Sequence, residues 1–236
     1  MTSTTPKLLE IKPVVVCTVL RRINRFVVEV EMGDRVSRVY LCNTGRLAGY
    51  LVKGREGFCA ENSRPRKLRY RLFSIRDDGL GAILDTQLQL KSFERAINLI
   101  PPFRDCKISR RNVRVGESVL DYLLKCPGGD LVLEVKSAVL RIDGYASYPD
   151  CPSTRARKQL RDLIRASDAG HRGAILFIAA LPNVSAFKPN IGADQELYRM
   201  LLEARDRGVE IGAISIAYNP EDLFIYLLDP WLRVEL

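Results

Sequence analysis

Two carboxylates and one lysine interrupt an otherwise apolar stretch of the chain. Asp121 lies in the run SVLDYLL, and Glu134 and Lys136 lie in the run LVLEVK. Residues two apart on a strand point to the same face, so Glu134 and Lys136 are expected side by side. Paired carboxylates can hold Mg²⁺ or Mn²⁺, hard cations that prefer oxygen ligands. Such a cation activates water, and a neighbouring ammonium stabilises negative charge on a phosphate. The three residues are therefore candidate catalytic residues of a metal-dependent phosphodiesterase, with Asp121 and Glu134 as metal ligands.

The hairpin between the two runs decides whether these groups meet. If its loop is centred between Pro127 and Gly128, Asp121 faces Glu134; if it is centred one residue later, Asp121 faces Lys136. In both registers the three groups share one face. A register between these two would send Asp121 to the opposite face and destroy the site.

The simpler alternative is an ordinary cross-strand ion pair at a sheet edge. Glu-Val-Lys is a weak signal by itself. The upstream aspartate, a helix before it and a helix and strand after it strengthen the catalytic interpretation. The resulting α-β-β-β-α-β order is that of the core of the PD-(D/E)xK nuclease superfamily.

The elements that position these residues follow from the patterns of the second half of the chain. Turn residues 127–130 separate the two runs, and Ser153 is a candidate N-cap with Gly170 as the matching stop. We expect the following elements from Gln87 onward: helix Leu88–Ile100, a strand within Val113–Leu124, strand Leu131–Leu140, polar loop Arg141–Ser153, helix Thr154–Ala169, buried strand Ala174–Leu181, helix Asp194–Arg207, and strands Val209–Ala217 and Leu223–Leu228.

The first half of the chain has only short strand patterns. Six short strands without a convincing helix predict a closed or nearly closed small barrel. The predicted fold class is thus α/β (α+β), with a barrel in residues 1–86 and a mixed sheet flanked by helices in residues 87–236. The strands are expected at Val14–Leu20, Phe26–Met32, Val36–Leu41, Gly57–Glu61, Leu68–Ile75 and Ala82–Thr86, with turns at Arg21–Asn24 and Asp77–Gly79.

The charge balance favours a polyanionic partner. Lys and Arg number 37 against 28 Asp and Glu, which gives a net charge of +9 and a pI near 9.4. Such an excess suits nucleic acid or an acidic membrane surface, although a basic protein without such a partner has the same composition. Basic residues that alternate with an aromatic suit a groove that tracks phosphates and stacks a base. The alternative is the outward polar face of an ordinary strand. The residues concerned are Arg64, Arg66, Lys67, Arg69 and Arg71, around Tyr70.

A second basic cluster lies in the helix expected after Ser153. Arg155, Arg157, Lys158 and Arg161 fall in its first two turns, and Arg155 and Lys158 are three apart on one face. Near a helix N-terminus, Arg155 and Lys158 are candidates to hold a scissile phosphate. A solvated helix face is the alternative.

Targeting and metal signals are sparse. The first twelve residues do not resemble a signal peptide and no run is long enough to span a bilayer, so we expect a cytoplasmic protein without membrane contact. The six cysteines contain no CxxC pair and His171 is the only histidine, which argues against a zinc site of usual spacing. We expect the cysteines to be small buried thiols, and the sequence leaves one or two disulfides open.

At these residues the chain resembles the sugar fermentation stimulation protein family (SfsA-type), over nearly its whole length. The resemblance implies an N-terminal OB-fold-like domain, a C-terminal PD-(D/E)xK domain, DNA binding and a nuclease role, with a link to the regulation of sugar metabolism. It makes Asp121, Glu134 and Lys136 the acid, acid and base, and places Arg46 in a family motif. The matching points are Arg25-Phe26, Asn43-Thr44-Gly45-Arg46-Leu47, Arg66-Lys67 with Tyr70, Asp85-Thr86, Val113–Glu117, Asp121-Tyr122, Glu134-Val135-Lys136, Tyr148-Pro149-Asp150, Arg155 and Lys158.

Some positions depart from the family pattern. Tyr40 and Gln159 stand where the family usually has histidine, and Val119 stands where it has arginine. Ala156 replaces a glycine, and Gln89-Leu90 replaces a Pro-Asn pair. These changes affect expected substrate contacts and leave the three catalytic positions intact. Glu94 matches an acidic position of the family and is a further candidate metal ligand, and Glu117 is a weaker one.

These observations together predict a nucleic-acid-binding protein with Mg²⁺- or Mn²⁺-dependent endonuclease activity, acting on DNA in preference to RNA. The alternative is a non-catalytic DNA-binding protein that regulates sugar fermentation (maltose metabolism) genes. Hydrolysis of a small phosphorylated metabolite is a third hypothesis, which the basic charge and the barrel disfavour. The sequence leaves a homodimer open.

Overall fold

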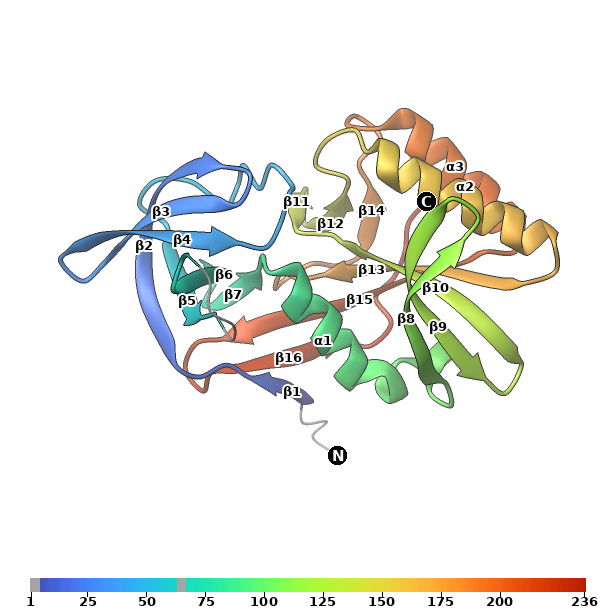
Figure 1. Cartoon of the computed structure of the whole chain (residues 1–236), viewed down its shortest axis with the longest axis horizontal. Helices are drawn as coiled ribbons and strands as arrows, with labels where there is room; N and C mark the ends of the chain where they lie inside the picture. Colours follow the sequence, from blue (N-terminus) through green and yellow to red (C-terminus); the bar gives the residue numbers. More distant parts are fainter. Residues whose placement is uncertain (1–4, 63–66) are drawn as a thin grey trace.

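The computed structural model describes residues 5–62 and 67–236, and one continuous sheet runs through both halves of the chain. Its strands follow the order β4-β3-β2-β5-β6-β7-β15-β13-β10-β9-β8, with β16 paired to β15 and β1 paired to β16. A separate three-stranded sheet has the order β11-β12-β14. Figure 1 shows the barrel strands at one end and helices α2 and α3 at the other. The fold is mixed α/β, as predicted.

The barrel is closed. Its strands are β2 (Val14–Asn24), β3 (Val27–Met32), β4 (Arg35–Leu41), β5 (Glu56–Glu61) and β6 (Tyr70–Asp77). A parallel pairing between β4 and β6 joins the two ends of the strand order and completes the ring. Closure leaves no strand edge exposed around the ring, which explains why a short, strongly curved sheet is stable here.

One predicted turn in the barrel is wrong. Residues 21–24 were expected to form a turn, but β2 continues to Asn24, and the chain turns at Arg25 and Phe26 instead. Irregular pairing between β2 and β3 shifts the register twice near this end. The alternation of apolar and polar residues in a sequence does not reveal such bulges. The sequence therefore predicts the turn at the polar residues before Arg25.

The C-terminal sheet is built around β13 (Arg172–Ala179), which is parallel to both neighbours. Helices cover both of its faces, which accounts for its uninterrupted apolar sequence. The remaining strands of this part are β7 (Leu80–Ile83), β8 (Lys107–Val115), β9 (Ser118–Cys126), β10 (Gly129–Ser137), β15 (Glu210–Asn219) and β16 (Phe224–Asp229).

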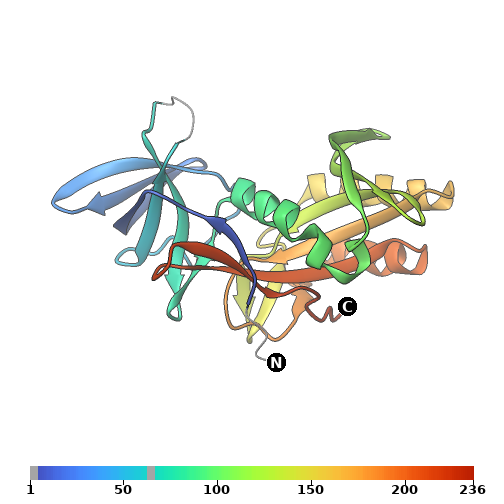
Figure 2. The same cartoon turned by 90° about the horizontal axis from the view of Figure 1, so that it is seen from below.

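Three α-helices flank the sheet. α1 (Thr86–Ala96) contacts β7 and β10, whereas α2 (Thr154–Asp168) contacts β9 and β13, and α3 (Gln195–Asp206) packs on α2 and β15. Figure 2 shows α1 apart from the α2–α3 pair. The side chain of Ser153 accepts a hydrogen bond from the Ala156 main-chain nitrogen, so the predicted N-cap is confirmed. None of the helices in the described part of the chain is both long and apolar enough to cross a bilayer.

Two predictions in the C-terminal half need correction. The single strand expected within Val113–Leu124 is a hairpin: β8 ends at Val115, Gly116 adopts a positive φ of 56°, and β9 begins at Ser118. The polar loop expected at Arg141–Ser153 contains a second hairpin, β11 (Leu140–Ile142) and β12 (Tyr145–Tyr148). Its turn residues are Asp143 and Gly144, both with positive φ. Asp-Gly is a preferred pair in such two-residue turns, so the sequence did contain a signal for this hairpin.

The first described strand lies next to the last one. β1 (Lys7–Glu10) pairs with β16, so the beginning of the chain completes the C-terminal sheet instead of joining the barrel. The third strand of the small sheet, β14 (Phe187–Pro189), pairs in parallel with β12. Neither short strand has a periodic pattern of its own. Both owe their conformation to tertiary pairing.

Two of the six cysteines form a disulfide. Cys106 and Cys126 are bonded, which corrects the expectation of thiols for this pair. The bond joins the segment before β8 to the end of β9 and so closes the base of that hairpin. Cys17 and Cys59 are buried thiols in the barrel, whereas Cys42 and Cys151 are partly exposed thiols.

The carboxylate of Asp85 connects the barrel to the C-terminal half. One oxygen accepts hydrogen bonds from the Gln87 and Leu88 main-chain nitrogens and caps α1. The other oxygen lies 3.0 Å from the guanidinium of Arg71, which belongs to β6 of the barrel. Asp85 is fully buried. Burial raises the pKa of its carboxyl, and Arg71 and the two N–H donors oppose that shift.

We expect Asp85→Ala to lower the free energy of unfolding by about 3–5 kcal/mol, because it leaves the Arg71 charge poorly compensated and removes a helix cap. The matched control is Glu61→Ala, which breaks the exposed Arg69–Glu61 pair nearby in the barrel. Exposed pairs contribute little, so the control should unfold close to the wild type. Urea denaturation followed by circular dichroism makes the comparison. Equal midpoints for the two variants would show that Asp85 does not join the two halves.

Candidate active site

The hairpin of β9 and β10 has one of the two registers that bring the candidate catalytic residues together. Leu131 pairs with Leu124, Val132 with Leu123 and Leu133 with Tyr122. This is the register centred between residues 127 and 128, in which Asp121 stands opposite Glu134. The geometric condition set by the sequence is therefore met.

The two strands separate just where the catalytic candidates lie. Their pairing ends at Tyr122–Leu133, after which β9 remains paired with β8 and β10 with β13. In the fork between them, Oδ2 of Asp121 accepts a hydrogen bond from the Val135 main-chain nitrogen at 2.8 Å. The Asp121 side chain thus accepts a main-chain hydrogen bond at the point where the pairing between β9 and β10 ends. The fork leaves room for polar groups within an otherwise apolar sheet.

Lys136 is held by two neighbours. Its Nζ lies 2.7 Å from Oε1 of Glu134 and donates to Oε1 of Gln159, on α2, at 2.6 Å. The amide nitrogen of Gln159 donates to the Val119 carbonyl at 3.2 Å, which fixes the orientation of the amide. Glu134 and Lys136 are 3% and 9% exposed. The ammonium is therefore fixed in direction by an acid on its own strand and an amide from the helix above.

Burial dominates the electrostatics of both carboxyls. It raises the pKa of Asp121, against the Val135 N–H and the positive charges of Lys136 and Arg155. It also raises the pKa of Glu134, against Lys136, while the charge of Asp121 adds to the rise. A further positive charge placed between the two carboxyls would therefore stabilise their ionised forms.

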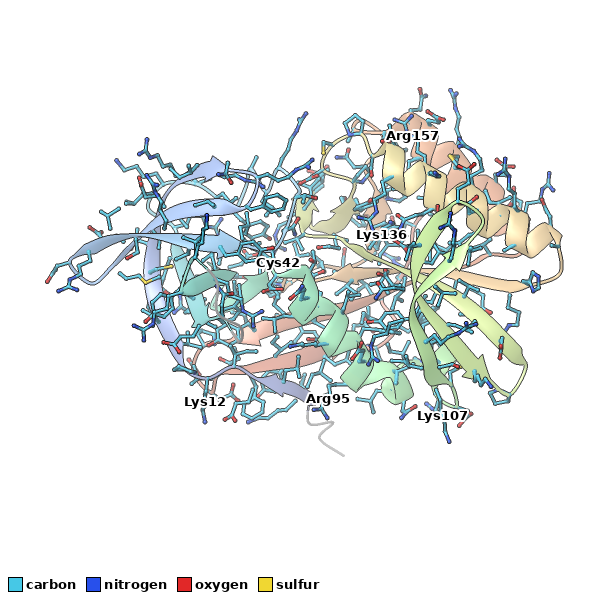
Figure 3. The ribbon with its side chains drawn as sticks, viewed as in Figure 1. Lys12, Cys42, Arg95, Lys107, Lys136 and Arg157 are labelled. Atoms are coloured by element: carbon cyan, nitrogen blue, oxygen red, sulfur yellow. A yellow bond between two sulfur atoms is a disulfide. The ribbon has the colours of Figure 1, made fainter. Side chains whose placement is uncertain are left out.

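A cleft of about 690 Å³ opens in front of these groups and is lined by both halves of the molecule. Figure 3 labels Cys42 on the barrel side and Lys136 on the sheet side. We call this space the cleft. From the C-terminal half it is lined by Asp121, Glu134, Lys136, Asp150, Arg155 and Gln159, and from the barrel by Arg25, Phe26, Tyr40 and the loop 42–47, among others.

The donor set suits a hard divalent cation. Oε2 of Glu134 is shielded from solvent and forms no hydrogen bond with any described residue. It belongs to the same fork as the Asp121 carboxylate, so two acids could supply oxygen ligands there. Within residues 5–62 and 67–236 no cluster of three or more Asp, Glu, His or Cys side chains forms a metal cage. A cation bound by these two carboxylates would therefore take its remaining ligands from water or from a substrate.

The third candidate ligand, Glu94, does not lie with the other two. Its carboxylate accepts two hydrogen bonds from Arg111, at 2.7 and 3.0 Å, and one from the Tyr122 hydroxyl at 3.0 Å. These hydrogen bonds, chiefly those from Arg111, lower the pKa of Glu94. Tyr122 points away from Asp121 because successive side chains of a strand alternate. Glu94 therefore belongs to a network on the other face, and it does not line the cleft.

The described members of the basic set predicted on the barrel do not line the cleft. Arg64 and Arg66 lie outside the described residues, and Lys67 is exposed. Arg69 pairs with Glu61, and its guanidinium lies 5.2 Å from the centroid of the Tyr70 ring. Neither Arg69 nor Tyr70 lines the cleft. The structure therefore does not bring these residues to the catalytic candidates.

The basic residues of α2 divide between the cleft and the surface. Arg155 lines the cleft and acts electrostatically on both candidate acids. Lys158 is exposed and pairs with Glu117 at 3.0 Å, which places both residues outside the cleft. Arg46 is exposed and lies near Cys151, whose thiol it influences electrostatically.

The barrel residues that line the cleft had a signal only through the family pattern, which did not assign them to the site. Arg25 and Phe26 form the turn between β2 and β3, and Tyr40 lies in β4. Phe26 was expected to begin a strand, whereas it lies at the hairpin turn and is 44% exposed. No local pattern indicates that this turn lines the same cleft as Asp121, because its placement depends on barrel closure. Gln159 likewise had a signal only as a departure from the family pattern.

A second contact between the two halves shapes one wall of the cleft. The guanidinium of Arg22 donates to the main-chain carbonyls of Asn43 and Gly45 and so holds this loop in place. The Leu47 main-chain nitrogen donates to Oδ2 of Asp150 at 3.2 Å. A Cβ added at Gly45 would lie 2.6 Å from the same oxygen, so only glycine fits. The Asn-Thr-Gly and Tyr-Pro-Asp motifs meet here, and their role in this contact is structural.

Comparison with known families agrees with this architecture. A family model described as "Sugar fermentation stimulation protein RE domain" matches residues 86–222. A second, described as "SfsA N-terminal OB domain", matches residues 20–83. The closed barrel is therefore an OB domain.

Individual relatives match over nearly the whole chain. A sugar fermentation stimulation protein homolog of Pyrococcus furiosus is 45% identical over 222 residues, which are 93% of this chain and 96% of that protein. A homolog of Archaeoglobus fulgidus is 43% identical over 228 residues, 97% of this chain and 99% of that protein. A solved structure of Pyrococcus furiosus SfsA, in complex with Ca²⁺, has a TM-score of 0.94 at 43% identity and covers 98% of this chain and 100% of its own.

We expect Gln159→Leu to lower the free energy of unfolding by about 1–3 kcal/mol, because the buried Lys136 ammonium loses one of its two acceptors. Lys158→Gln is the matched control, one residue away on the same helix, and it removes only an exposed ion pair. The control should leave the urea midpoint close to that of the wild type. If Gln159→Leu is as stable as the control, the amide does not hold Lys136.

Proposed function

This chain belongs to the sugar fermentation stimulation protein (SfsA) family, and from that premise we propose that it binds DNA and cleaves it as a divalent-metal-dependent endonuclease of the PD-(D/E)xK type. The observation that carries the proposal is the fork between β9 and β10, where Asp121, Glu134 and Lys136 line one cleft. An ordinary surface ion pair would not need a buried, unpartnered carboxylate oxygen such as Oε2 of Glu134.

The roles follow from the positions. Asp121 and Glu134 would hold Mg²⁺ or Mn²⁺, for which their oxygen donors are suited. The cation lowers the pKa of water and neutralises charge on the reacting phosphate. Lys136, directed by Gln159, would donate a hydrogen bond to the attacking water or to a phosphate oxygen. Arg155 lines the same cleft and would neutralise the phosphate from the opposite side.

The relatives support the proposal in part. The solved Pyrococcus furiosus SfsA contains Ca²⁺, an oxygen-seeking divalent cation of the same chemical class. The N-terminal OB domain provides a fold whose surfaces commonly bind oligonucleotides. With a net charge of +9, the chain has the electrostatic excess that DNA binding needs.

We expect Asp121→Asn and Lys136→Ala to abolish Mn²⁺-dependent cleavage of plasmid and oligonucleotide DNA while retaining most of the DNA affinity. Asp121→Asn removes the negative charge of one proposed metal ligand. Lys136→Ala removes the ammonium group that would donate a hydrogen bond to the attacking water or to a phosphate oxygen. Glu94→Gln is the matched control, because its carboxylate is engaged by Arg111 and Tyr122 outside the cleft. The control should cleave like the wild type. A gel assay with and without metal reads the result.

Wild-type protein that binds DNA but cleaves no substrate with Mg²⁺ or Mn²⁺ would overturn the nuclease proposal. It would favour the regulator hypothesis instead, with the Glu134–Lys136 pair neutralising itself in the sheet. Cleavage that survives in Asp121→Asn would place the chemistry elsewhere.

We expect DNA binding to weaken steeply with salt, because released counterions drive it. Even two phosphate contacts reduce the affinity about ten-fold between about 50 and 200 mM monovalent salt. Arg155→Ala should make the slope of log K against log [salt] shallower by about one contact. Fluorescence anisotropy titrations over that range give the slopes. A flat salt dependence would contradict phosphate-driven binding.

A further inference from the structure

Two aromatic rings stand together on the barrel side of the cleft. Phe26, in the turn between β2 and β3, and Tyr40, in β4, have ring centroids 6.5 Å apart and planes inclined by 18°. Both residues line the same cleft as Asp121 and Glu134. Single exposed apolar side chains are common and need no explanation. An exposed phenylalanine nearly parallel to a tyrosine ring, inside a cleft with candidate catalytic acids, is a more specific arrangement.

Positive charges line the cleft from both halves of the molecule. Arg25 precedes Phe26 in the same turn and lines the cleft from the barrel. Arg155 lines it from the first turn of α2. A nucleic-acid strand lying in the cleft would thus meet a cation at each wall. Aromatic side chains combined with a basic groove are the usual means by which proteins bind single strands without reading sequence.

The size of the cleft limits what can enter it. Its volume of about 690 Å³ falls within the roughly 300–1,000 Å³ of pockets that hold a drug-sized molecule. One or two nucleotides are of that size. A base within a duplex is stacked on its neighbours and paired, so it must first be unpaired before it can stack on an aromatic side chain.

The other aromatic residue in the predicted basic set has different surroundings. The guanidinium of Arg69 lies 5.2 Å from the centroid of the Tyr70 ring and also pairs with Glu61. Tyr70 does not line the cleft. The Tyr70 ring therefore lies under a cation outside the cleft, whereas Phe26 lines the cleft that contains the two acids.

We propose that the Phe26–Tyr40 pair stacks an unpaired nucleobase, so that the site accepts single-stranded or locally unpaired nucleic acid. This inference rests on the function proposed above and adds its substrate class. Every base has a π-face, so stacking here gives selectivity for unpaired bases without selectivity for sequence. The stacked base would anchor the strand on the barrel wall while its backbone passes Arg155 and the two carboxylates.

The test is a binding comparison in EDTA, where no cleavage occurs. A labelled DNA oligonucleotide and the duplex of the same sequence are titrated by anisotropy with wild-type protein, Phe26→Ala, Phe26→Trp and Tyr70→Ala. The wild type should bind the single strand more tightly. Phe26→Ala should weaken single-strand binding roughly five-fold or more and leave duplex binding nearly unchanged. Phe26→Trp should retain affinity, and Tyr70→Ala should resemble the wild type.

A second readout reports stacking directly. 2-Aminopurine in the single strand should lose fluorescence on binding to the wild type and to Phe26→Trp, and should keep it with Phe26→Ala. Melting curves of the variants confirm that each is folded, as expected for a 44% exposed side chain. A repeat with RNA of the same sequence distinguishes the two kinds of strand.

Equal binding by wild type and Phe26→Ala, an equal loss for single strand and duplex, or a larger loss in Tyr70→Ala would each overturn the inference. The outcome is separable from that of the nuclease proposal. Stacking in EDTA without cleavage in Mn²⁺ would overturn only the nuclease activity. Cleavage that persists without stacking would overturn only the substrate class.

Discussion

The buried carboxylate of Asp85 is the interaction on which the arrangement of the two halves depends. It begins α1 with one oxygen and holds the barrel strand β6, through Arg71, with the other. α1 in turn contacts β10, the strand that carries two of the three candidate catalytic groups. A charge buried in this way persists only when its partners are in place. The position of the barrel relative to the fork therefore depends in part on the contacts of Asp85 with Arg71 and with the start of α1.

The fork allows charged side chains to be buried within the sheet with hydrogen-bond partners. Acids and ammonium groups are costly to bury unless they are paired and hydrogen-bonded. Here the main-chain ladder between β9 and β10 stops at Tyr122, and the carboxylate of Asp121 takes the N–H that the ladder releases. Lys136 then shares its protons between Glu134 and Gln159. Among the described residues, none donates a hydrogen bond to Oε2 of Glu134, although this oxygen is buried.

Local sequence signals predicted which residues of the C-terminal half form the candidate site, but not which barrel residues line the cleft. The apolar runs and the Pro127-Gly128 turn permitted two registers that bring Asp121 and Glu134 to one face, although they did not exclude the register between them. Ser153 indicated where α2 begins. Those are short-range properties. Phe26 and Asp121 line the same cleft because of barrel closure and the β7–β15 pairing, which link residues far apart in sequence. In the same way, nothing local showed that Glu61 and Arg69 form an ion pair across adjacent strands.

The pairing of β1 with β16 has a consequence for how the protein is made. These strands stand near opposite ends of the chain, with the barrel and most of the C-terminal sheet between them. During synthesis β1 emerges before the barrel, yet its partner β16 emerges only after the barrel and the other strands of the C-terminal sheet. The barrel can close on its own strands early, since all five lie before residue 78. The segment ahead of the barrel must remain unpaired until β16 has been made, so the C-terminal sheet reaches its full width only then.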